Sequence, residues 1–78
     1  MPVQIRVDAF DRRGLLRDVS DAMAQERLSI DSVSSQVDRA ERVATIMMRT
    51  AVRDAAQLRQ LLKRLGGINS VLRAQRST

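Results

Sequence analysis

A short charged segment, Asp11-Arg12-Arg13-Gly14-Leu15-Leu16, lies between an alternating apolar stretch and an amphipathic one. Where a strand ends and a helix begins, unpaired backbone N–H groups and the positive end of the helix dipole attract carboxylates or phosphates. Gly14 has no side chain, so a ligand or a partner chain can approach the backbone there. An ordinary strand-to-helix turn with Asp11 as the helix cap explains the same residues equally well. The segment is therefore a candidate site for a small charged ligand.

The side chains that most catalytic and metal sites need are missing from this sequence. The 78 residues include no cysteine and no histidine. Without cysteine there is no disulfide framework, thiolate metal site or iron–sulfur cluster. Histidine is the usual general base and the commonest metal ligand. We therefore expect no catalytic residues, no metal and no cofactor.

The net charge is +5 at pH 7, and all but one of the 14 basic residues are arginine. The arginines are dispersed, which permits contact with nucleic acid but is also ordinary surface chemistry. No apolar run approaches the ~20 residues of a membrane span. Met1 leads directly into a predicted strand without a signal peptide. We expect a cytoplasmic chain that does not contact membranes.

The first half of the sequence predicts a strand, a helix and a second strand. Apolar and polar residues alternate over Val3–Ala9, as in a half-buried strand. A helix is predicted over Leu15–Glu26, with one apolar face formed by Leu15, Leu16, Val19, Ala22 and Met23. The second strand is predicted over Leu28–Asp38. Its apolar parity shifts after Ile30, which predicts a bulge near Asp31-Ser32.

The second half predicts a third strand, a second helix and a last strand. After a polar connection at 38–41, the third strand is expected over Val43–Val52, with apolar residues also on its outer face; that face is expected to pack on a partner such as a second copy. Asp54 and Gln57 have the spacing of a capping box, and leucines then repeat at helical spacing. Gly66-Gly67 is expected to end this helix with a left-handed residue. The last strand is predicted over 68–75.

The order of elements is β-α-β-β-α-β, which predicts an α+β fold of the ferredoxin-like kind. In this two-layer sandwich both helices cover one face of a four-stranded antiparallel sheet. We expect one domain over residues 1–78, and a chain this short buries only about 60% of its unfolded surface. A partner chain is therefore expected to add stability. Base stacking, as in RNA-recognition modules, is not expected because Phe10 is the only aromatic residue.

The segment Phe10–Val19 resembles the ACT domain family, together with Leu28-Ser29-Ile30, Ser34-Ser35 and Val43–Met48 at the proper distances. The Asp-Arg-x-Gly-Leu-Leu core is shared by many ACT domains. Arg17-Asp18-Val19 and Ala44-Thr45-Ile46 narrow the resemblance to the C-terminal ACT domain of RelA/SpoT-type enzymes, which make and hydrolyse (p)ppGpp. The resemblance covers Val3 to Arg76.

The resemblance implies a regulatory domain without catalytic activity, paired as a homodimer and belonging to a longer (p)ppGpp synthetase/hydrolase, a GTP pyrophosphokinase. In ACT domains an amino acid binds between the loop after the first strand and the second strand of a neighbouring copy. The corresponding ligand-binding residues here are Asp11, Arg12, Arg13, Gly14, Leu15, Leu16, Ile30, Asp31 and Ser32. N–H groups from Gly14 onward suit a carboxylate, Asp11 or Asp31 an ammonium, and Leu15 with Ile30 an aliphatic side chain.

Two other interpretations stay open. In long RelA/SpoT enzymes the domain also contacts the ribosome and tRNA, so the chain could be an RNA-docking module in which Arg12 and Arg13 bind phosphate. It could also be an ACT domain of another amino-acid-metabolic regulator. At the level of single residues, Leu15, Leu16 and Ile30 are also expected in a core, and Arg12 and Arg13 on a solvated surface.

Overall fold

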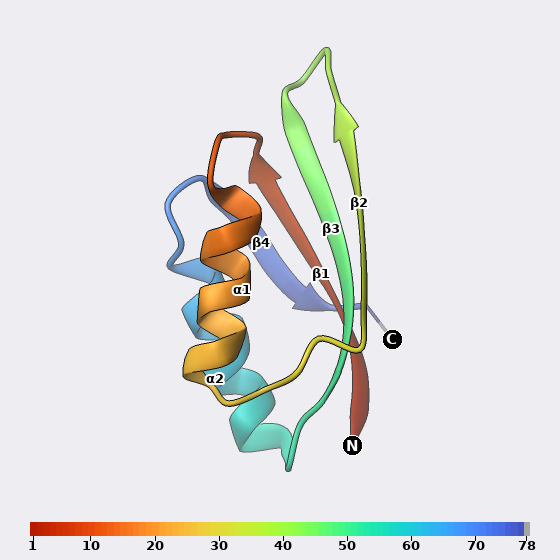
Figure 1. Cartoon of the computed structure of the whole chain (residues 1–78), viewed down its shortest axis with the longest axis vertical. Coiled ribbons are helices and arrows are strands. Elements are labelled where there is room, and N and C mark those ends of the chain that lie inside the picture. Colours follow the sequence, from red (N-terminus) through yellow and green to blue (C-terminus); the bar gives the residue numbers. More distant parts are fainter. Residues whose placement is uncertain (78) are drawn as a thin grey trace.

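The computed structural model describes residues 1–77 and contains the predicted order of elements. These are β1 (Pro2–Phe10), α1 (Leu15–Gln25), β2 (Ser32–Asp38), β3 (Val43–Ala51), α2 (Ala55–Gly66) and β4 (Val71–Arg76). The strand order in the sheet is β2-β3-β1-β4, and all neighbouring strands are antiparallel. Both helices lie on one face of the sheet (Figure 1). The ferredoxin-like prediction is confirmed.

The core lies between the two helices and the central strands. Alternate residues of β1 and β3 face it, and each helix contributes one apolar stripe. Its fully buried members include Ile5, Val7, Val19, Met23, Ile46, Met48, Leu61 and Leu65. Burying one such side chain contributes about 1.5–3 kcal/mol, so the core positions β1, β3 and α1 firmly around the loop that joins β1 to α1.

Strand β2 is the edge of the sheet that the helices leave uncovered. Every one of its residues is exposed. Val33 and Val37 pair with Met48 and Ala44 of β3, whose side chains face the core. Their own side chains therefore lie on the helix side of the sheet, yet they remain 47% and 46% exposed. Both the free edge of β2 and its helix-side face are open.

The second strand begins later than predicted, and it carries no bulge. Its pairing with β3 is continuous from Ser32 opposite Arg49 to Asp38 opposite Val43. The apolar parity shifts because Leu28 and Ile30 belong to the connection before β2, where they are partly buried against the core. The irregularity of the sheet lies instead where β4 pairs with β1, between Asp8 and Ala9.

The helix ends agree with the sequence only in part. The N-cap of α1 is Gly14 and not Asp11, and no side chain caps this helix. At α2 the Asp54 carboxylate accepts the Gln57 N–H at 2.8 Å as predicted, but Gln57 Oε1 accepts the N–H of Arg53, at 2.7 Å. The second helix ends at the glycine pair, but Gly67 has φ −85°, so the predicted left-handed glycine is wrong.

The last strand starts at Val71, three residues later than expected, because residues 68–70 form the turn before it.

Candidate functional site

The loop between β1 and α1 is held in a conformation that favours glycine. Gly14 has φ 83° and ψ 0°, in the left-handed region. A Cβ built on Gly14 would meet only Arg17 Nη2 at 3.6 Å and Arg12 Nη1 at 3.7 Å. Both distances are ordinary contacts, so the backbone conformation and not crowding favours glycine here.

The start of α1 presents unused hydrogen-bond donors. The Leu15 N–H donates to Arg12 O at 3.3 Å and the Asp18 N–H to Gly14 O at 3.0 Å. The N–H groups of Gly14, Leu16 and Arg17 donate to no atom of residues 1–77. They lie at the positive end of the α1 dipole, where an anionic group is stabilised.

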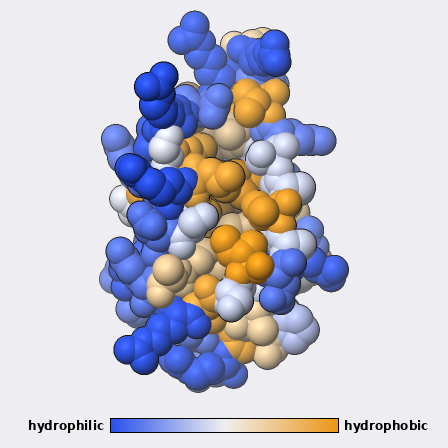
Figure 2. All heavy atoms as spheres, viewed as in Figure 1, coloured by the Kyte–Doolittle hydropathy of each residue, from blue (hydrophilic) through white to orange (hydrophobic). Residues whose placement is uncertain are grey.

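A hollow of about 260 Å³ opens beside these donors, on the helix side of the sheet. It is lined by the loop and the first turn of α1 together with β2 and β3: Asp11, Arg12, Gly14, Leu15, Leu16, Arg17, Ser35, Val37, Ala44 and Ile46. Apolar side chains gather along the middle of this face of the molecule (Figure 2). The hollow is small for a drug-sized ligand, and its mixture of free N–H groups, charge and apolar surface suits a compact zwitterion.

The structure brings together the first half of the predicted site. Five predicted residues line the hollow: Asp11, Arg12, Gly14, Leu15 and Leu16. Arg13 does not line it. Leu16 is 51% exposed, so its predicted place on the buried face of α1 is wrong, whereas Leu15 is part of the core. The Asp11 carboxylate makes no hydrogen bond or ion pair within residues 1–77 and can accept a cation.

The second half of the predicted site lies at the other end of the sheet in the same chain. Ser32, at the start of β2, pairs with Arg49, whereas the loop adjoins the opposite end of β3 through the Asp11 N–H bond to Arg42 O, at 2.8 Å. Asp31 lines a separate hollow with Pro2 and Arg49. Ile30, Asp31 and Ser32 therefore meet the loop only if a second copy supplies them.

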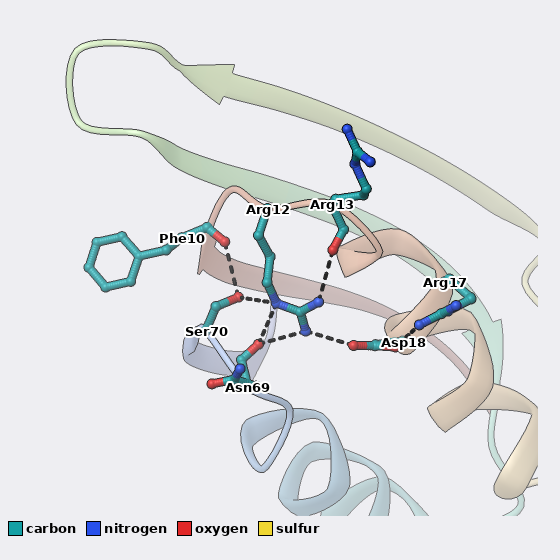
Figure 3. Close-up of polar contacts among 7 residues, drawn as sticks. All are labelled: Phe10, Arg12, Arg13, Arg17, Asp18, Asn69 and Ser70. Carbon is teal, nitrogen blue, oxygen red and sulfur yellow. Dashed lines mark hydrogen bonds and ion pairs between the residues drawn. The ribbon is translucent and has the colours of Figure 1, made fainter.

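Arg12 is used inside the protein. Its guanidinium donates to Asp18 Oδ2 at 2.6 Å and to Asn69 O at 2.8 Å (Figure 3). The hydrogen bond from Arg12 holds the pKa of the Asp18 carboxyl below its ordinary value, with a further contribution from its charge and that of Arg17. Arg17 is more exposed: its side chain is 78% exposed, and its Nη2 lies 3.6 Å from Asp18 Oδ1 in a looser ion pair.

Sequence reasoning missed five residues of the hollow: Arg17, Ser35, Val37, Ala44 and Ile46. Arg17 follows Gly14 by about one helical turn, so its position could have been found from helix geometry. Ser35 and Val37 share the face of β2 that carries Val33, so the alternation of that strand could have placed them together.

A larger hollow, of about 570 Å³, lies on the helix-free face of the sheet. Its central carboxylate, Asp8, already accepts Arg6 Nε at 3.2 Å and Thr45 Oγ1 at 2.9 Å, and Arg73 Nη2 lies 3.7 Å away. Because these groups neutralise and satisfy one another, the loop at Gly14 is the stronger candidate site.

Neither a metal centre nor a membrane-spanning helix is found in the described part of the chain. Residues 1–77 contain no group of three or more acidic, histidine or cysteine side chains placed to hold a metal ion. Neither of the two helices in that range has the length and apolar character needed to cross a bilayer.

The sequence profile of the ACT domain matches residues 1–76, so this chain belongs to the ACT domain family. The resemblance noted in the sequence is thereby confirmed.

Two GTP pyrophosphokinases are similar to this chain in sequence. The GTP pyrophosphokinase of Haemophilus influenzae is 38% identical over 74 residues, which are 95% of this chain and 10% of that protein. The GTP pyrophosphokinase of Escherichia coli K12 is 35% identical over 72 residues, or 92% of this chain and 10% of that protein. The chain thus spans about a tenth of the length of these relatives.

Solved structures share the fold. The ACT domain from the GTP pyrophosphokinase of Chlorobium tepidum superposes with a TM-score of 0.83, at 16% identity, covering 97% of this chain and 96% of that one. The small subunit of acetolactate synthase from Thermotoga maritima gives a TM-score of 0.84, at 13% identity, covering 97% and 47%.

Proposed function

We propose that this chain is the regulatory domain of a GTP pyrophosphokinase of the (p)ppGpp-synthesising class, that it binds an amino acid at the β1–α1 loop, and that it pairs with a second copy along β2. The similarity to two GTP pyrophosphokinases supports the parent enzyme. The chain supplies regulation, and the chemistry belongs to other domains of such an enzyme.

The hollow beside the unused N–H donors at the start of α1 is the observation that supports amino-acid binding. The ligand carboxylate accepts hydrogen bonds from the N–H groups of Gly14 and Leu16, and it forms an ion pair with Arg17. The ammonium pairs with the free Asp11 carboxylate. An aliphatic side chain lies between Leu16 and Val37, which are both about half exposed.

The second copy completes the site. Two β2 strands related by a twofold axis run antiparallel, so the Ser32 end of one strand lies beside the Asp38 end of the other. This arrangement places Ile30, Asp31 and Ser32 of one copy near the β1–α1 loop of its neighbour. A ligand bound between copies stabilises the pair by mass action, which is the simplest way for binding to reach other domains.

A thermal-shift screen against the amino acids, each at ~10 mM, tests the ligand. A site of ~1 mM affinity adds about 1.4 kcal/mol and raises Tm by roughly 5–10 °C in a domain of this size. A selective shift with aliphatic amino acids is expected, and Gly14→Ala, which strains the loop that supplies the donors, should reduce it. Gly66→Ala, in the open at the end of α2, is the matched control and should leave the shift intact.

A flat screen would contradict amino-acid binding at this affinity and would favour docking to RNA or protein. RNA docking is then tested by the salt dependence of binding in Arg13→Glu, because phosphate contacts give a steep slope. Arg12 is unsuitable for this test, since its charge is paired with Asp18 and its loss would disturb the loop.

A further inference from the structure

Arg12 joins two loops that are far apart in the sequence. Its Nε donates to Asn69 O at 3.1 Å and to Ser70 Oγ at 3.2 Å, and its Nη2 donates to Asn69 O at 2.8 Å. Asn69 and Ser70 form the turn between α2 and β4. One side chain of the β1–α1 loop therefore holds a turn 57 residues away.

The rest of the guanidinium is also occupied. Nη2 donates to Asp18 Oδ2 at 2.6 Å, and Nη1 donates to Arg13 O at 3.2 Å. Every guanidinium nitrogen thus has an acceptor inside the chain, and the group lies at the centre of the cluster in Figure 3. To contact a ligand, Arg12 would have to give up charge-assisted bonds that are among the strongest available to a side chain.

The α2–β4 turn is also hydrogen-bonded to the end of β1. The Phe10 N–H donates to Ser70 O at 2.9 Å, and Ser70 Oγ donates to Phe10 O at 3.0 Å. Ser70 has φ 79°, a conformation that L residues avoid unless their surroundings impose it. Phe10, Arg12, Asn69 and Ser70 therefore form one unit, which we call the loop clamp.

The loop clamp sets the geometry of the donors at Gly14. Arg12 O accepts the Leu15 N–H, so the residue that carries the clamping side chain also carries the first backbone bond of α1. Asp18, bound to the same guanidinium, lies in the first turn of α1. A loop fixed at both ends keeps the N–H groups of Gly14 and Leu16 in place before a ligand arrives, which lowers the entropic cost of binding.

We propose that Arg12 is a positioning residue: it holds the β1–α1 loop in its ligand-binding conformation through the α2–β4 turn and does not contact the ligand. Arg13 is outside this network except for its carbonyl, and in Figure 3 its side chain points away from the cluster. The binding of a ligand at this loop rests on the proposed function, whereas the clamping of the loop by Arg12 does not.

The clamp is tested first without any ligand, by amide hydrogen exchange in Arg12→Lys and in the matched control Arg13→Lys. Lysine keeps the charge but cannot reproduce the fork of donors. We expect exchange of the Phe10 amide to accelerate about tenfold or more in Arg12→Lys, as for the loss of one or two charge-assisted bonds, with the Val7 amide unchanged. Equal exchange at Phe10 in both variants would overturn the proposal.

The second measurement separates positioning from contact, with leucine and leucinamide as probes. If Arg12 only positions the loop, Arg12→Lys weakens both probes, because the carbonyl oxygen of leucinamide accepts from the same N–H groups as the leucine carboxylate. If Arg12 binds the carboxylate directly, the loss is confined to leucine, and the proposal is wrong. Should the unaltered chain bind neither probe, the amino-acid function fails for these probes, and hydrogen exchange alone decides whether Arg12 clamps the loop.

Discussion

At the scale of single residues, Gly14 stabilises the conformation of the β1–α1 loop. Its φ of 83° costs an L residue about 1–2 kcal/mol, although a Cβ has room there. We expect Gly14→Ala to lower the free energy of unfolding by about that amount in urea denaturation. Gly66→Ala should instead raise it by about 0.5–1 kcal/mol, since Gly66 lies at the end of α2 with nothing near its missing Cβ. Equal effects of the two variants would contradict this assignment.

Asp18 gives the loop a pH dependence of definite sign. The hydrogen bond from Arg12 lowers the pKa of Asp18 from its ordinary 3.8. The ionised form is therefore favoured by folding, and its contribution to stability is complete above the unfolded pKa of about 3.9. That contribution disappears as the pH falls through the lower pKa of the folded state.

The measurement compares the free energy of unfolding of the unaltered chain and Asp18→Asn between about pH 2 and pH 6. The unaltered chain should be more stable at the upper end, and the two curves should converge toward the acid end. Asp21→Asn is the control, because this exposed carboxylate makes no ion pair in residues 1–77. A difference that grows as the pH falls would contradict the assignment.

The sequence predicted where the candidate site would lie, but not which of its residues make contacts inside the protein. The charged Asp-Arg-Arg-Gly segment before an amphipathic stretch indicated where free N–H groups would lie. The role of Arg12 could not be predicted, because its acceptors at Asn69 and Ser70 are 57 and 58 residues away and only the packing of β4 beside β1 brings them close. The same limit applies to Asp11, which seemed a suitable cap until the backbone placed Gly14 there.

At the scale of the elements, α1 ends in a Schellman motif with an arginine where glycine is usual. Arg27 has φ 58°, its N–H donates to Ala24 O at 2.9 Å, and the Leu28 N–H donates to Met23 O at 3.0 Å. Leu28 packs against the core and completes the motif. The left-handed Arg27 therefore stores a backbone cost that glycine would remove.

We expect Arg27→Gly to raise the free energy of unfolding by about 0.5–1 kcal/mol, after the greater flexibility of glycine in the unfolded chain is taken into account. Arg27→Ala should change it little, because the alanine keeps the strained φ. The two variants are compared by urea denaturation at constant m-value. A stabilisation in both variants would point to the charge of Arg27 and would contradict the backbone explanation.

Hydrophobic periodicity predicted which elements exist and in what order, but not all of their boundaries. The leucine repeat of α2 and the alternation in β1 were sufficient because each has one buried face. The start of β2 was missed because Leu28 and Ile30 are partly buried without being in a strand. An edge strand whose residues are all exposed has little hydrophobic pattern. The register of β2 is therefore evident only from its pairing with β3.

At the scale of the whole molecule, the two helices cover the sheet unevenly. The α2 helix packs beside β4 and the central strands are buried, but β2 has no helix packed over it, and within residues 1–77 only its inner edge is paired, with β3. An edge of this kind is a template for pairing with another chain, and its exposed valines on the helix side add apolar surface to the pair. The proposed homodimer satisfies both features at once.

The dimer predicts that one charge on β2 separates the copies, while an equal charge elsewhere does not. Val33 is 47% exposed and does not line the ligand hollow of its own chain, so Val33→Lys costs the single chain little but places a charge opposite Val37 of the other copy, in the apolar part of the proposed contact. We expect it to weaken association by about tenfold or more in sedimentation velocity over a concentration series. Leu72→Lys, at 54% exposure in the hollow of the helix-free face, is the matched control and should leave association unchanged.

If Leu72→Lys separates the copies and Val33→Lys does not, the copies pair through the open face of the sheet instead. The β1–α1 loop would then have to bind its ligand without the second strand of a neighbour.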